Sequence, residues 1–87
     1  MSEYRQINRT QTVRYYFNIR DQDGLICDEE GTELPDMEAA REEARLSARD
    51  FAIDDLRRDS PIGSRQIEIA DERGTLMGAI LVRDIVR

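Results

Sequence analysis

Hydrophobic and polar residues alternate at the start of the chain. Over residues 12–20, Val13, Tyr15, Phe17 and Ile19 fall on one side and polar residues dominate the other, which predicts a strand with one face buried. Residues 21–24 end in Asp-Gly, which favours a tight turn because glycine adopts positive φ without steric cost. We therefore predict a hairpin whose return strand covers residues 25–28.

The pattern changes to a helical period after Pro35. Over residues 37–58 apolar side chains recur every three or four positions, which predicts an amphipathic helix. Asp36 is the expected N-cap, and residues 60–63 are expected to stop the helix because they include a proline and a glycine. The predicted buried stripe is Met37, Ala40, Ala44, Ala48, Phe51, Ala52 and Leu56.

Two more alternating runs, residues 65–70 and 75–82, flank a turn at residues 71–74 and predict a second hairpin. The element order ββαββ predicts an α+β fold, with an antiparallel sheet of about four strands and one long helix packed on one face. Residues 1–11 are expected to form a flexible leader and residues 12–87 a single domain. Expected to face the helix are Ile67, Ile69, Leu76, Ile80 and Val82.

Charge narrows the classes of function. Charged residues make up 37% of the 87 positions, the net charge is −6, and all basic residues are arginine, with no lysine or histidine. This balance disfavours general binding to nucleic acid or to an anionic membrane. Cys27 is the single cysteine and cannot form an internal disulfide, and no segment approaches the ~20 apolar residues of a membrane span. We expect a cytoplasmic protein.

Several short motifs carry a family resemblance. In chain order they are RYYF from Arg14, IRD from Ile19, DGL from Asp23, DEEG from Asp28, ELPD from Glu33, AAR from Ala39, IEI from Ile67 and VRD from Val82. They resemble a family of short proteins common in rhizobia and related alphaproteobacteria that is known only as a domain of unknown function. The resemblance covers residues 14–87, so it implies domain limits and brings no catalytic or binding residues.

A second resemblance is to the antitoxin subunit (HicB) of the HicAB toxin and antitoxin system. Residues 15–56 read as strand, Asp-Gly turn, strand, Pro-Asp and helix, as the N-terminal part of such antitoxins does. This is a likeness of fold. It implies a nucleic-acid-associated regulator as the alternative function.

The acidic first hairpin raises the question of a cation site, since hard cations prefer carboxylate ligands. If Gly24 took the glycine position of an EF-hand loop, Asp21 and Asp23 would fall on ligand positions and Glu30 on the terminal one. However, Ile19 would then occupy the first ligand position. A solvated turn is the preferred interpretation, weak divalent-cation binding is a further alternative, and no metal ligand is assigned.

The inventory for catalysis is small. There is no histidine for acid and base chemistry, and Cys27 therefore lacks an imidazole partner. The adjacent carboxylates Asp54 and Asp55 diverge on a helix and are expected on a solvated surface. The sequence predicts no enzymatic activity, no catalytic residue and no cofactor.

An aromatic cluster follows Arg14, and aromatic side chains exposed on a sheet can stack nucleobases. Alternation places Tyr15 and Phe17 in the core and leaves Tyr16 outward, beside Arg14 and Arg20. Core packing is the preferred interpretation of the cluster.

Two surfaces have more apolar residues than a ββαββ unit needs to fold. Ala39, Leu46 and Ile53 recur every seven residues on the helix side opposite the buried stripe, where solvent, the leader or another chain would meet them. The outer sheet face is expected to carry Tyr16, Met77, Ala79 and Leu81. These seven residues form the candidate interface of a small protein-interaction or regulatory module, with a homodimer or an unidentified protein as partner.

Overall fold

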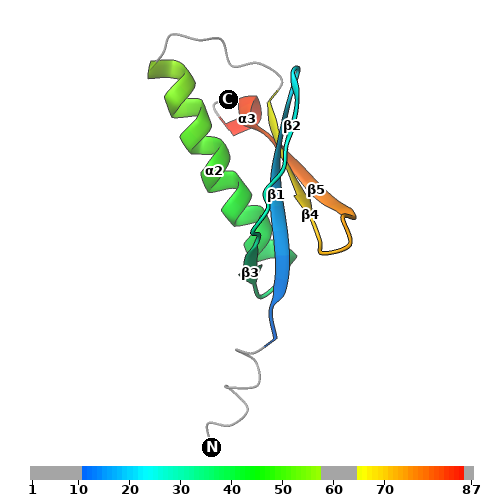
Figure 1. The fold of residues 1–87 in the computed structure, drawn as a ribbon. Helices are drawn as coiled ribbons and strands as arrows, with labels where there is room; N and C mark the ends of the chain where they lie inside the picture. The colour runs from blue at the N-terminus through cyan, green and yellow to red at the C-terminus, as the bar shows by residue number, and fades with distance from the viewer. Residues whose placement is uncertain (1–10, 58–64, 86–87) are drawn as a thin grey trace, which may run out of the picture.

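The computed structural model describes residues 11–57 and 65–85. Most of the predicted leader, the predicted last helical residue Arg58 and the stop at residues 60–63 lie outside the described residues. An antiparallel sheet and a long helix make up the fold (Figure 1), so the α+β prediction is confirmed.

The strand β1 (Val13–Asp21) is the centre of the sheet. On one side it pairs with β4 (Gln66–Ala70), which pairs in turn with β5 (Leu76–Leu81). On the other side β2 (Gly24–Ile26) and β3 (Thr32–Leu34) share the length of β1. All pairs are antiparallel and the order is β2-β1-β4-β5, with β3 beside β1.

Both predicted hairpins form, and an aspartate side chain holds each turn. The carboxylate of Asp21 accepts a hydrogen bond from the amide of Asp23 at 2.8 Å. In the second turn the Asp71 carboxylate accepts from the amides of Arg73 and Thr75, each at 2.9 Å. Such local bonds to backbone amides are the reason that Asp initiates turns.

The helix α2 (Met37–Arg57) begins at the predicted cap. The Asp36 carboxylate accepts from the amide of Ala39 at 2.9 Å, which satisfies one of the unpaired donors of the first turn. Every alanine of the predicted stripe is at most 1% exposed against the sheet. The buried core is Tyr15, Ala40, Ala44, Ala48, Ala52, Ile67, Ile69 and Val82.

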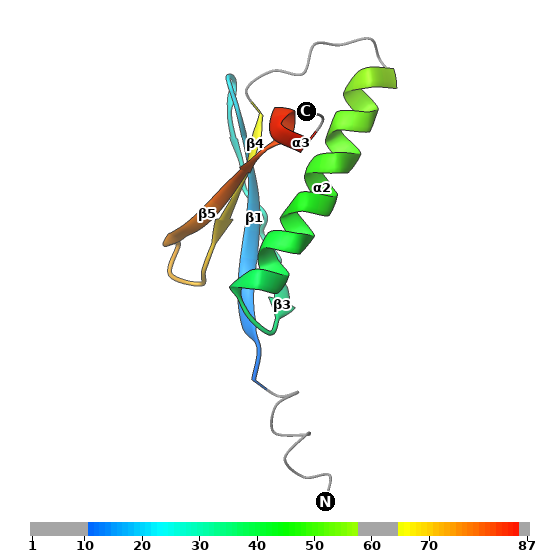
Figure 2. The same cartoon turned by 180° about the vertical axis from the view of Figure 1, so that it is seen from behind.

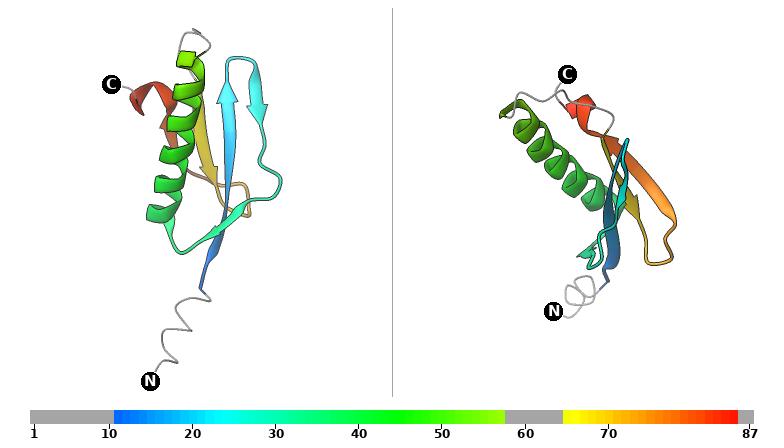
Figure 3. Two further views of the ribbon diagram at one scale, coloured as in Figure 1. Left: turned by 90° about the vertical axis from the view of Figure 1, so that its left-hand side faces the viewer. Right: turned by 45° about the horizontal axis from the view of Figure 1, so that its top comes forward.

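The two helices lie on one side of the sheet. In Figures 1 and 2, α2 and the short helix α3 (Val82–Ile85) stand together on that side, and Figure 3 shows the same arrangement from two further directions. Of the described helices, none covers the opposite face, which is called the outer face below.

Details of the strands and of the chain end differ from the sequence-based expectations. Residues 32–34 form β3, where only a connection was expected, and Val82 begins α3, although it is buried as predicted. The prediction that Leu76 faces the helix is wrong. A register shift pairs Ala70 with Leu76 and Ile69 with Gly78, which leaves Met77 as the extra residue. Leu76 therefore lies opposite Ala70 and is 60% exposed.

The alanine stripe yields a test of the packing. Ala44→Leu adds volume where the helix and the sheet are already in contact, so we expect the free energy of unfolding to fall by about 1–3 kcal/mol. Arg49→Leu adds the same side chain at an exposed helical position and should change it by less than about 0.5 kcal/mol. Urea denaturation of both variants measures the difference, and equal costs would contradict tight packing at Ala44.

Candidate functional site

The acidic segment between β2 and β3 is built around Asp28. One carboxylate oxygen accepts from the Phe17 amide and the other from the amides of Glu30 and Gly31, all at 3.2 Å. The amide of Asp28 donates to the side-chain oxygen of Asn18 at 2.9 Å. Asp28 thus fills the gap along β1 between β2 and β3, on the side of Phe17 opposite its β4 partner Ile69.

Gly31 completes this loop because no larger residue fits there. Its φ is +74°, and a Cβ atom would lie 2.9 Å from side-chain carbons of both Arg14 and Tyr16. Arg14 also holds the loop from outside: its guanidinium donates to the Glu30 carbonyl at 2.7 Å and to the Glu33 carboxylate at 2.8 Å. The DEEG motif therefore has a structural role.

The cation hypothesis for this hairpin gains no support from the geometry. Asp21 and Asp28 direct their carboxylates to main-chain amides. Within residues 11–57 and 65–85, no group of three or more acidic or cysteine side chains is placed to hold a metal ion. Cys27 is exposed.

An ion pair occupies the middle of the outer face. The Arg20 Nε donates to Glu68 Oε2 at 2.6 Å, and the Gln66 amide donates to the same oxygen at 2.9 Å. The hydrogen bond from Arg20 holds the pKa of Glu68 below its ordinary value, although burial opposes this shift. The same bond raises the pKa of Arg20.

The apolar part of the outer face lies over β5. The register places Ala79 beside Glu68 and Leu81 beside Gln66, so both point outward as predicted. Met77 is exposed, and the register shift adds Leu76 to this surface. Tyr16 lies on the same face beside Ala70 but is half-buried.

The second predicted surface lies on the back of α2, away from the sheet. Leu46 is 45% exposed and Ile53 is 46% exposed, whereas Ala39 is half-buried. Leu56 was predicted to lie in the buried stripe, and this is wrong, because it is 64% exposed. We call Ala39, Leu46 and Ile53 the helix-back surface.

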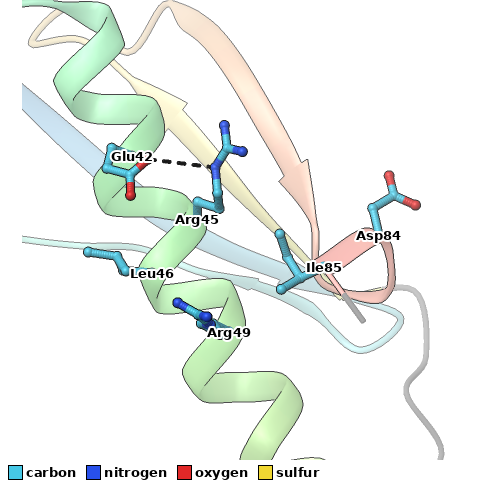
Figure 4. Close-up of a pocket in the computed structure, with 6 residues that line it drawn as sticks. All are labelled: Glu42, Arg45, Leu46, Arg49, Asp84 and Ile85. Carbon is cyan, nitrogen blue, oxygen red and sulfur yellow. Dashed lines mark ion pairs between the residues drawn. The ribbon is translucent and has the colours of Figure 1, made fainter. Parts of the chain in front are cut away.

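Leu46 borders a groove of about 350 Å³ between α2 and α3. Figure 4 shows its lining residues, with Arg45 and Arg49 from α2 and Ile85 from α3. Arg45 is 3.8 Å from the Glu42 carboxylate. The groove is open and mixes charged with apolar groups.

Asp55 was placed wrongly by the sequence. It is only 6% exposed, and its carboxylate lies 3.6 Å from the Arg65 guanidinium. Arg65 also lies over the Phe51 ring, 5.0 Å from its centre. Asp55 follows Phe51 by four positions and Ala52 by three, so the helical period alone places it on the buried stripe.

Residues 14–83 match the family described as Domain of unknown function (DUF6894). The chain belongs to this family. No curated protein and no solved structure matches it. None of the described helices of this DUF6894 chain is long and apolar enough to cross a membrane.

The Asp28 loop of this DUF6894 chain can be tested at Gly31. Gly31→Ala should lower the free energy of unfolding by about 2–4 kcal/mol, because the cost of a positive φ at alanine adds to the cost of steric overlap with neighbouring side chains. Gly74→Ala is the matched control: φ is +84°, but no atom lies within 4 Å of the added carbon, so we expect about 1 kcal/mol. Equal losses on thermal or urea unfolding would show that the loop can open around a side chain.

The Arg20–Glu68 ion pair should make the stability of the fold depend on pH. The folded-state pKa of Glu68 lies below its ordinary value of 4.5, so the pair stabilises the fold above that pH. Its contribution is lost as the pH falls through the folded-state pKa. Glu68→Gln should therefore be less stable than the wild type near neutrality, and the difference should close below pH 4.5. A pH-independent difference would contradict the shift.

Proposed function

We propose that this chain is a small protein-interaction module of the cytoplasm, with no cofactor and no catalytic chemistry of its own. The observation that carries the proposal is the exposure of large apolar side chains on two separate surfaces of a highly charged chain. One is the helix-back surface, and the other is the outer face over β5. Exposed apolar patches bounded by polar residues are typical of protein interaction sites.

The lack of reactive groups supports the second half of the proposal. The sequence has no histidine, and the carboxylate with the greatest burial among the described residues, Asp55, faces an arginine. An ion-paired carboxylate in this position serves to hold Arg65 against α2.

The alternative of a nucleic-acid-associated, HicB-like regulator draws on Arg14, Tyr16 and Arg20 on the outer face. Both arginines are ion-paired there, Arg14 with Glu33 and Arg20 with Glu68. The local charge is therefore balanced, which gives phosphate groups little attraction. The interaction module is the better supported of the two.

Site-specific photo-crosslinking in living cells tests the proposal. A photoreactive amino acid replaces Leu46 or Met77 in turn, and Glu29, exposed on the acidic hairpin, serves as the matched control position. We expect discrete protein adducts from Leu46, Met77 or both, and none above background from Glu29. Adducts to DNA or RNA would favour the alternative, and background levels at all three positions would contradict the proposal.

A further inference from the structure

The strand β5 leaves one edge of the sheet open. It is last in the strand order, and among the described residues only β4 pairs with it. In Figures 1 and 2 no labelled element lies beyond it. An unpaired edge presents free backbone donors and acceptors, and proteins usually protect such edges with charges, short strands or irregularities.

The two edges of this sheet differ in their protection. The β2 and β3 edge has two strands of three residues each, and the connection between them carries Asp28, Glu29 and Glu30. By contrast, residues 75–82 contain no charged side chain, although 37% of the chain is charged. Only the bulge at Met77 interrupts the β5 edge, so this edge has the character of a pairing surface.

The hydrogen bonds between β4 and β5 show which backbone groups of β5 point toward the open edge. The Val82 amide donates to the Arg65 carbonyl at 3.0 Å, so the position of Val82 is hydrogen-bonded to the β4 side. Along an antiparallel pair such positions alternate, and Ile80 and Gly78 therefore also turn their amides toward β4. The backbone groups of Ala79 and Leu81 then point away from the sheet, into the open edge.

We propose that β5 pairs with β5 of a second copy of this chain, antiparallel, about a twofold axis that passes beside Ala79. The proposal rests on the interaction module proposed above and names its partner. Ala79 would exchange two hydrogen bonds with Ala79 of the second copy. Leu81 would pair with Met77 of that copy, and the two sheets would become one continuous sheet.

Symmetry and charge favour a second copy over another partner. An antiparallel strand pair with a residue opposite itself is self-complementary, as a twofold contact requires. Both copies carry a net charge of −6, and the uncharged edge lets them meet without opposing like charges. Glu68, the cross-strand neighbour of Ala79 on the outer face, is ion-paired with Arg20.

The packing around Gly78 selects the position of the axis. Met37 and the guanidinium of Arg41 lie 3.0 Å and 3.9 Å from where a Gly78 Cβ would be. An axis at Gly78 would therefore bring the two Arg41 side chains toward each other. With the axis at Ala79, each Gly78 faces Ile80 of the other copy, so that a small residue meets a large one.

Disulfide trapping tests the proposal on the full chain. The test uses Ala79→Cys in a Cys27→Ser background. In the proposed dimer the Cα atoms at position 79 of the two copies would lie about 5.5 Å apart, a Cα–Cα distance that a disulfide spans. We expect dimeric cross-links to form at least about tenfold faster than for Asp23→Cys on the opposite edge, because pairing raises the effective concentration of the thiols. Leu46→Cys, on the helix-back surface, reports an alternative dimer.

The outcomes separate this inference from the proposed function. A dimeric chain that cross-links through Ala79→Cys supports both. A dimer that cross-links through Leu46→Cys alone, or a chain that stays monomeric by light scattering at high concentration, overturns the β5 pairing. In those cases photo-crosslinks at Leu46 or Met77 would still support an interaction module.

A backbone substitution gives a second measurement of the same contact. Ala79→Pro removes the outward amide and leaves the β4 ladder intact, because that amide is not bonded to β4. The two hydrogen bonds lost across the axis should raise the dimer dissociation constant by about 30-fold. Sedimentation measures it, and an unchanged dissociation constant in a folded variant would overturn the proposal.

Discussion

The close approach of α2 to the sheet is the constraint on which the rest of the structure depends. Ala40, Ala44, Ala48 and Ala52 bring the helix backbone against the strands, and the large buried side chains come instead from the sheet and from Val82. Alanine gives the highest helical propensity and the least side-chain entropy loss. A core this thin is sufficient for one helix and one sheet face, and it leaves the other sides of both elements uncovered.

The uncovered sides of α2 and of the sheet carry the exposed apolar residues that suggest an interaction module. A two-layer domain normally shows polar residues on its outer surfaces, and much of this chain does so, with ion pairs at Arg14 and Arg20. The exceptions include Leu46 and Ile53 on the back of α2, Leu25 and Ile26 on β2, and β5 with its uncharged edge. In contrast, the Asp28 carboxylate in the acidic loop accepts hydrogen bonds that hold the segment between β2 and β3 against β1.

Local signals were sufficient to predict much of the fold. The cap at Asp36, the two hairpin turns at residues 21–24 and 71–74 and the period of α2 depend on residues close in sequence, and all were predicted. The strand β3 was missed because its three residues are extended only through pairing with β1. Leu76 was misplaced because a register shift between β4 and β5 leaves no mark in the alternation.

Side-chain partners distant in sequence were harder to foresee than elements. Asp55 was placed on the surface because its neighbour Asp54 suggested a solvated pair, although the helical period places Asp55 inward, opposite Arg65. Ala79 and Leu81 were identified correctly as outward, since the alternation of β5 is regular beyond the register shift. Which edge of the sheet stays open follows only from strand order, which the sequence does not contain.

Amide hydrogen exchange along β5 tests the central claim most directly, because it reads the edge residue by residue. In a dimer paired through β5, the amides of Ala79 and Leu81 should be protected along with those of Gly78 and Ile80, and their protection should fall on dilution. Fast exchange of Ala79 and Leu81 at every concentration, beside protected Gly78 and Ile80, would show an edge that stays open and would contradict the account.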